Sequence, residues 1–276
     1  MSPRRAAALR GAAAALATFV LVAPLVVMVL GAFREPGRTP PVGLELLEVA
    51  PTIAAFERAF ELVPLGRQLL NSLAVVAVAV PLTVLFASLS GFAMTRLAPR
   101  ARRIALGFTL LCLTIPLPAL WVPRFAVYRE LGVLDTYVPL WAPALVGTSP
   151  VLVLLAYWSA RRIPPDLVDA ARLEGLGPWR TWWRIVVPLT RPTLFAIGAL
   201  AFVFHWSNFI DPLLYLFSPE LATLPQGLSS LRQLGPADTP VLLAGAVVAT
   251  LPPVLAFALV QRRFLNDTRE AGWFGR

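Results

Sequence analysis

The sequence contains no lysine, one cysteine and one histidine. Without lysine, the phosphate-binding pattern G-x-x-x-x-G-K-[ST] cannot occur, so the chain cannot hydrolyse ATP by P-loop chemistry on its own. Cys112 and His205 are too few to build a metal cluster, a Cys/His dyad or a disulfide framework within one chain. The G-x-S-x-G pattern of serine hydrolases is also missing. We therefore predict no metal, no cofactor and no catalytic residue, with a membrane enzyme that uses His205 as the alternative.

Charged residues are also scarce, at 14% of the chain, whereas hydrophobic residues make up 58% and the mean hydropathy is +0.73. A helix needs about 20 apolar residues to cross a hydrocarbon layer of about 30 Å. Six blocks reach or approach this length: 12–30, 69–94, 104–121, 139–158, 193–217 and 241–260. We predict an all-α integral membrane protein with six transmembrane helices, in one domain over 1–276, whose first span is a retained signal anchor.

The arginines are unevenly distributed, and their distribution predicts the orientation in the membrane. Seventeen of the 24 basic residues, but only five of the 15 acidic ones, fall in residues 1–11, 96–103, 159–192 and 261–276. Positively charged loops are retained on the cytoplasmic side. Both termini are thus predicted to be cytoplasmic, in a multi-pass membrane protein. Orientation accounts for the net charge of +9, and no nucleic-acid partner is predicted.

One polar stretch, residues 163–190, interrupts the apolar blocks between the fourth and fifth spans. A proline followed by an acid favours a helix start, which predicts a short helix from Pro165 to about Glu174. Gly175 is predicted to end it in the left-handed conformation. A second short helix should start near Pro178 and be broken by Pro188 before the fifth span.

Two interpretations of this stretch follow from the residues alone. Leu167, Ala170, Ala171 and Glu174 are spaced three and four apart, which predicts one small, low-profile helix face that permits another backbone to approach closely. The alternative is an amphipathic hairpin at the membrane surface, held to lipid headgroups by arginines and by three tryptophans, Trp179, Trp182 and Trp183.

The spacing of the stretch resembles a known motif. Asp169, Ala170 and Ala171, then Gly175, Ile185, Val187 and Pro188, follow the pattern E-A-A-x3-G-x9-I-x-L-P, with Asp in place of Glu and Val in place of Leu. This pattern is typical of the permease subunits of binding-protein-dependent ABC importers. The resemblance implies a coupling helix pair that inserts into a separate cytoplasmic ATPase. The coupling residues it implies are Asp169, Ala170, Ala171, Glu174, Gly175, Ile185 and Pro188.

Four other segments resemble the carbohydrate branch of that family, the class of the smaller maltose permease subunit. They are NSLAVVAVAVPLTVLFASLSGFAMTR (71–96), ELGVLDTY (130–137), FHWSNFIDPLLYL (204–216) and QRRFLNDTREAGWFG (261–275). The resemblance implies a sugar or oligosaccharide importer that works by alternating access. Its implied partners are an ABC ATPase dimer, a second homologous permease subunit, an extracytoplasmic solute-binding protein and membrane lipid. A permease for glycerol phosphate, an amino acid or phosphate is the alternative.

A group of polar residues lies within the fifth predicted span. His205, Asn208 and Asp211 follow one another at steps of three, which on a continuous helix would place them on one stripe. Polar groups inside a membrane face protein or water, so the stripe is a candidate lining for the solute pathway, with Trp206 offering a ring face to a sugar. Hydrogen bonding between helices, without any contact to solute, is the alternative.

Overall fold

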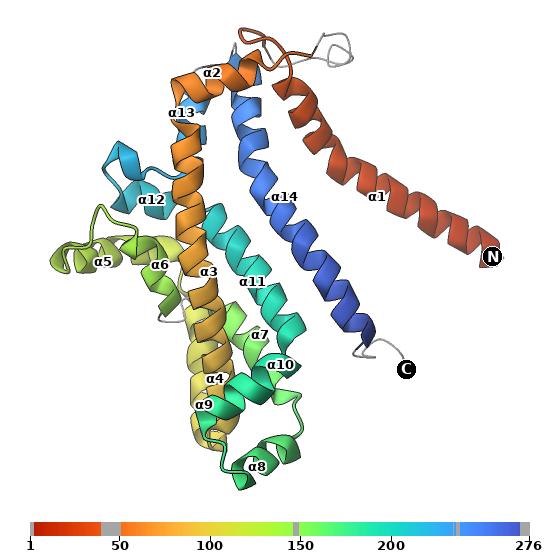
Figure 1. Cartoon of the computed structure of the whole chain (residues 1–276), viewed down its shortest axis with the longest axis vertical. Helices are drawn as coiled ribbons and strands as arrows, with labels where there is room; N and C mark the ends of the chain where they lie inside the picture. The colour runs from red at the N-terminus through yellow and green to blue at the C-terminus, as the bar shows by residue number, and fades with distance from the viewer. Residues whose placement is uncertain (1–2, 40–50, 146–148, 234, 236–237, 271–276) are drawn as a thin grey trace. The chain divides into compact units, whose positions relative to one another are not determined.

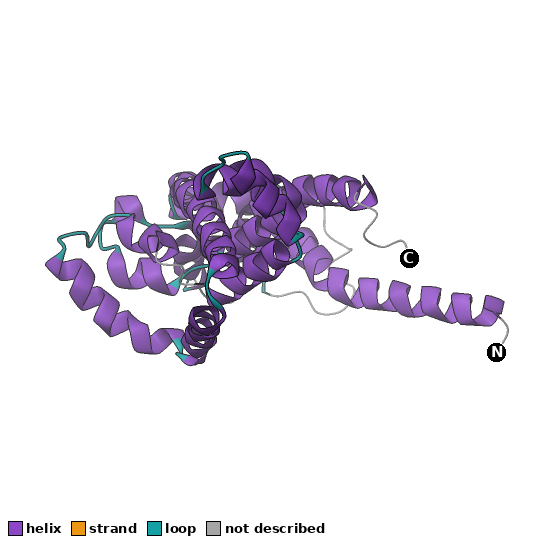
Figure 2. Ribbon diagram, turned by 90° about the horizontal axis from the view of Figure 1, so that it is seen from below, coloured by secondary structure: helices purple, strands orange, loops and turns teal. Residues whose placement is uncertain are grey.

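The chain is built from helices throughout its described part. The computed structural model describes residues 3–39, 51–145, 149–233, 235 and 238–270, and every regular element in these ranges is helical (Figures 1 and 2). The elements are α1 (Pro3–Ala32), α2 (Ala54–Leu62), α3 (Leu65–Arg96), α4 (Pro99–Thr114), α5 (Leu117–Glu130), α6 (Val138–Leu145), α7 (Pro150–Arg161), α8 (Pro165–Leu173), α9 (Pro178–Thr181), the π-helical turn η2 (Trp182–Val186), α10 (Val187–Leu189), α11 (Arg191–Trp206), α12 (Ile210–Tyr215), the 3-10 turn η3 (Pro219–Leu221), α13 (Leu224–Arg232) and α14 (Thr239–Glu270).

One compact unit comprises residues 1–67 and 224–252. Within it, α1 contacts the first part of α14, where Thr250 Oγ1 lies 4.0 Å from Met28 Sδ. The rings of Phe33 and Phe56 pack with their centroids 5.2 Å apart beside α2.

The second compact unit comprises residues 68–223 and 253–276. Its central core joins α3, α7 and α11 through small and branched side chains. The buried members of this core are Ala87, Leu152, Val153, Ala156, Ile197 and Ala201. Both candidate sites lie within this unit.

Four helices are long and apolar enough to cross a membrane by themselves: Arg10–Ala32, Leu65–Arg96, Val138–Arg161 and Thr239–Ala258. Two helix pairs pass the same test together but are sharply bent, so the described residues hold four candidate spans, or up to six if each pair is one span. The four helices coincide with the first, second, fourth and sixth predicted blocks. The third block falls on the bent pair Pro99–Thr114 and Leu117–Glu130, and the fifth block begins in Arg191–Trp206, the second helix of the other pair.

The third predicted span is not one straight helix. The chain turns by 97° between α4 and α5, at Ile115 and Pro116. Proline disfavours the helical conformation of the residue before it, and Ile115 accordingly lies in the extended region, at φ −78° and ψ 116°. The apolar block 104–121 is therefore two helices that meet at a sharp bend.

The fifth predicted span is also interrupted. Its first helix, α11, ends at Trp206, and Ser207 to Phe209 separate it from α12. The Asn208 side chain stabilises this break, because its Oδ1 accepts the backbone N–H of Asp211, in the first turn of α12, at 3.2 Å. His205, Asn208 and Asp211 thus do not share one helical stripe, which corrects the periodicity argument.

Candidate functional sites: a coupling segment and a polar cavity

The segment 163–190, named here the coupling segment, turns at Gly175 as the sequence predicts. The first helix, α8, ends in a Schellman motif: Leu176 N–H donates to the Ala171 carbonyl at 2.9 Å and Gly175 N–H to the Arg172 carbonyl at 3.0 Å. Gly175 has φ +76°, the left-handed region that favours glycine. The predicted helix and its glycine stop are confirmed.

The exposed face of α8 differs from the one that the spacing predicts. Ala171 is buried together with Val168, so the four residues expected on one face are divided between two. Leu167, Ala170 and Glu174 remain exposed. Leu173 is 90% exposed, which is unusual for a leucine and leaves an apolar side chain available for a contact outside the chain.

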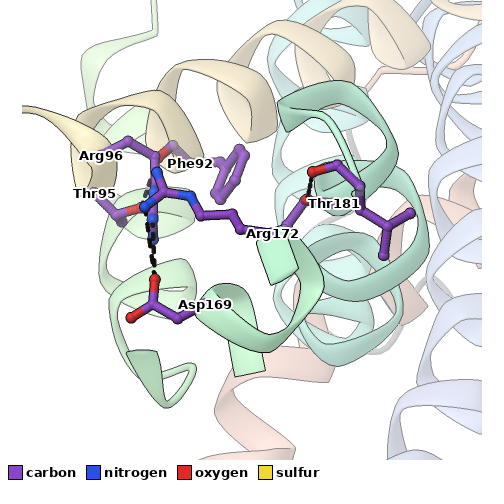
Figure 3. A network of polar contacts seen from close by, with 7 residues as sticks. Phe92, Thr95, Arg96, Asp169, Arg172 and Thr181 are labelled. Carbon is purple, nitrogen blue, oxygen red and sulfur yellow. Dashed lines mark hydrogen bonds and ion pairs between the residues drawn. The ribbon is translucent and has the colours of Figure 1, made fainter. Parts of the chain in front are cut away.

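Asp169 links α8 to the end of α3. Its carboxylate lies 3.9 Å from the Arg96 guanidinium and 3.6 Å from that of Arg172, as Figure 3 shows. Each of these exposed pairs contributes little stability. Their main effect is positional, since they join α8 to a helix long enough to span the membrane. Sequence spacing alone could not identify Arg96, which precedes Asp169 by 73 residues.

The second half of the coupling segment is anchored in the helix bundle by Trp182. This side chain is only 3% exposed, packs in a cluster with Phe92, Ala160 and Val186, and donates its indole N–H to Ser88 Oγ at 2.9 Å. Trp182 is thus a core residue, contrary to its expected position among lipid headgroups. Trp179 and Trp183, by contrast, are 61% and 60% exposed.

The sequence predicts that Pro188 breaks the second helix, but the helix continues through this residue to Leu189. The five-residue turn η2 widens the helix and leads into α10, with Val187 N–H donating to the Trp182 carbonyl. Pro188 then lies at the first turn of α10, where its missing N–H is tolerated. The chain then bends by 85° after α10, between Pro178–Leu189 and Arg191–Trp206.

A second candidate site is a cavity of about 280 Å³, named here the polar cavity. Despite the break after α11, His205, Asn208 and Asp211 all line it. Trp121 and Arg124 of α5 line it as well. The sequence pattern does not identify these two residues as part of the site. They lie outside the fifth predicted span, and nothing in the local pattern connects them with that span.

The polar residues of the cavity are partly bound to one another and to neighbouring helices. His205 Nε2 lies 3.1 Å from Thr83 Oγ1 of α3, and the Asn208 amide donates to the Asp211 carboxylate at 2.9 Å. Trp206 is buried and stacks on Phe202 at 5.5 Å, and it is not among the cavity-lining residues. The geometry thus places three of the four predicted pathway residues together and Trp206 elsewhere.

Asp135 connects the two walls of the polar cavity from the loop after α5. Its backbone N–H donates to the Tyr215 carbonyl, and its carboxylate accepts the N–H groups of Phe217 and Ser218, each at 2.9 Å. Donation from the Ser218 hydroxyl, then from these N–H groups, holds the pKa of Asp135 below its ordinary value. The contribution of these hydrogen bonds to folding stability is therefore fully present above the ordinary carboxyl pKa. It is lost as the pH falls through the lowered pKa of Asp135.

The fold and the two sites together define a multi-span membrane component of a transport system. Residues 12–269 match the binding-protein-dependent transport system inner membrane component family, and the chain belongs to this family. It is thus a transporter membrane subunit and not an enzyme, as the coupling-segment motif predicts.

Curated relatives and a solved structure agree with this family. The chain is 33% identical to the sulfoquinovosyl glycerol transport system permease protein SmoH of Agrobacterium fabrum, over 82% of this chain and 79% of that protein. It is 30% identical to the arabinooligosaccharides transport system permease protein AraQ of Bacillus subtilis, over 90% and 89%. Its fold matches a chain of a bacterial ABC transporter involved in the import of the acidic polysaccharide alginate, with a TM-score of 0.75, 18% identity and coverage of 95% and 98%.

Proposed function

We propose that the chain is the membrane subunit through which an ATP-driven importer moves a sugar or oligosaccharide. The observation that carries this proposal is the coupling segment, which exposes α8 and buries Trp182 among the spanning helices. When a partner protein moves a polar helix pair of this design, the movement can be transmitted to the helix bundle. The names of the relatives support a sugar as the solute, whereas a permease for glycerol phosphate, an amino acid or phosphate is the alternative.

The partner at the coupling segment is a cytoplasmic ABC ATPase dimer. Leu173 and Ala170 on the exposed face of α8 would enter a groove on the ATPase, with Gly175 setting the angle to the second helix. Asp169, through Arg96, and Trp182, through Ser88, would transmit the movement to α3. Ile185 and Pro188, both partly exposed, would shape the far end of the contact.

The arginine distribution supports the membrane arrangement that this mechanism requires. We propose six spans in one permease domain over 1–276, at about 12–30, 69–94, 104–121, 139–158, 193–217 and 241–260, with both termini in the cytoplasm of a prokaryotic cell. Membrane lipid surrounds this domain. Alternating access further requires a second, homologous permease subunit, giving a heterodimer, and an extracytoplasmic solute-binding protein that delivers the sugar.

The polar cavity lies on the proposed solute pathway. We expect His205→Ala and Asn208→Ala each to reduce sugar uptake about tenfold or more while the amount of protein in the membrane stays nearly unchanged, since polar groups inside a membrane generally mark substrate paths. Uptake by the complete transporter in proteoliposomes measures this, with Ser230→Ala, outside the cavity, as the control.

A second variant separates the pathway from bonding between helices. Thr83→Val removes the hydroxyl beside His205 but keeps the size of the side chain. Near-normal uptake is expected, because Thr83 would only orient the ring. If Thr83→Val reproduces the loss seen in His205→Ala, or if both cavity variants import normally, these residues serve packing and not transport.

A further inference from the structure

The polar cavity contains an arginine whose donors are not used within the described chain. Arg124, on α5, is half-buried and lines the cavity. Arg38, Arg58, Arg96, Arg129 and Arg172, by contrast, each form an ion pair with a carboxylate. A guanidinium carries five N–H donors, so a ligand with acceptor oxygens in this cavity can bind to it.

Asp211 supplies the complementary acceptors in the same cavity. One of its carboxylate oxygens accepts the Asn208 amide, and a carboxylate can accept several further hydrogen bonds. The cavity therefore offers donors on the α5 wall and acceptors on the α12 wall. A sugar hydroxyl both donates and accepts, so adjacent hydroxyls of one ring can satisfy Arg124 and Asp211 together.

Trp121 adds an aromatic surface one helical turn before Arg124. Its ring is partly exposed and forms no pair with another aromatic ring in the part of the chain that the structure describes. An indole face is apolar and electron-rich, which suits the C–H face of a sugar. Ring stacking and hydroxyl pairing would then act on different faces of the same ligand.

The two walls are held at a fixed distance, as a binding site requires. The Tyr215 hydroxyl donates to the Trp121 carbonyl at 3.4 Å, and the Tyr128 and Tyr215 rings pack edge to face at 5.2 Å. Asp135 ties the loop after α5 to the end of α12. The ring and the guanidinium on α5 are thus positioned opposite Asp211.

We propose that the polar cavity is a binding site for a single sugar ring with adjacent free hydroxyls. Trp121 stacks on the ring, while Arg124 and Asp211 form hydrogen bonds with its hydroxyls. The volume of about 280 Å³ is near the lower limit of roughly 300 to 1,000 Å³ for ligand pockets, which fits one ring and not a whole oligosaccharide. This inference rests on the proposed import function and adds a site that this subunit itself contributes.

The test uses the complete transporter with its binding protein in proteoliposomes. A panel of labelled arabinotriose, lactose and sulfoquinovosyl glycerol first shows which sugar the unmodified transporter imports. Arg124→Gln and Trp121→Leu should then each raise KM for that sugar about 10- to 100-fold, the range expected for a lost hydrogen bond to a charged group or a lost stacking surface. Arg124→Lys and Trp121→Phe should restore part of the loss.

A deoxy analogue of the imported sugar, lacking one of two adjacent hydroxyls, makes the test specific. The unmodified transporter should import it poorly, and Arg124→Gln should lose little more on it, because the contact is already missing. Arg129→Gln is the matched control, since Arg129 lies on the same helix, is exposed and pairs with Glu130.

The possible failures are distinguishable. Import of none of the panel sugars by the unmodified transporter would contradict the proposed function. Normal import that Arg124→Gln and Trp121→Leu leave unchanged would overturn the ring site alone. If either variant instead loses the second permease subunit on purification, the cavity is a subunit contact and the ring site is likewise overturned.

Discussion

Replacing Gly175 with valine should abolish recovery of the ATPase with the purified chain, and with it solute uptake. Gly175 is the left-handed residue of the Schellman motif that ends α8, at φ +76°. A left-handed conformation costs a residue with a side chain roughly 1 to 2 kcal/mol, and a β-branched residue more. Relaxing this strain would turn α8 away from its position, while nothing lies within 4 Å of the new Cβ atom to disturb packing.

The same loop contains a matched control. Gly177 lies two residues later, at φ −68° and ψ 165°, a conformation that valine adopts readily, and a Cβ there also meets no atom within 4 Å. Gly177→Val should therefore keep ATPase recovery and uptake. Equal amounts of both variants in the membrane would show that insertion is intact. Full ATPase recovery with Gly175→Val would mean that the coupling segment is only a surface anchor.

A second large effect is expected at Gly91, where α3 and α7 come into backbone contact. A Cβ atom on Gly91 would lie 2.5 Å from Tyr157 N, 2.7 Å from Ala156 C and 2.8 Å from Ala156 Cβ. Because backbone atoms cannot rotate away, the two helices would have to separate, at a cost of about 1 to 3 kcal/mol or more. Gly91→Ala should lower the amount of folded protein in the membrane several-fold.

Gly198→Ala provides the comparison for Gly91→Ala. This glycine also lies in a spanning helix, but its Cβ would meet only the Val84 side chain, at an ordinary 3.6 Å. Thermal inactivation of the purified complex and the protein level in membranes are the measurements. A normal level and unchanged thermal stability in Gly91→Ala would show that α3 and α7 do not approach as closely as described.

The features that the sequence predicts well are those set by local chemistry. The length of the apolar blocks predicts helices near α1, α3 and α14, because lipid imposes one length on every span. The end of α8 at Gly175 follows from the conformational preference of a single residue. The prediction needed no knowledge of which helices pack together.

The features that the sequence does not predict depend on tertiary contacts or on competing local signals. Trp182 has the same sequence neighbourhood as Trp179 and Trp183, and it is a core residue because it contacts Ser88, Phe92 and Ala160, which are far away along the chain. Asn208 interrupts an apolar block in which the spacing of polar residues predicts a continuous helix. Trp121 and Arg124 join the cavity only because the chain bends at Pro116, so periodicity within the fifth block could not find them.

Cross-linking at Leu173 is the most direct test of whether a separate ATPase contacts this chain at α8. Leu173 is 90% exposed, so a photoreactive residue at this position should be tolerated. Phe108 of α4, also an exposed apolar residue, at 66%, provides the control position. We expect illumination of the complete transporter to join position 173, but not 108, to the ATPase. Cross-links from position 173 to lipid alone would contradict it.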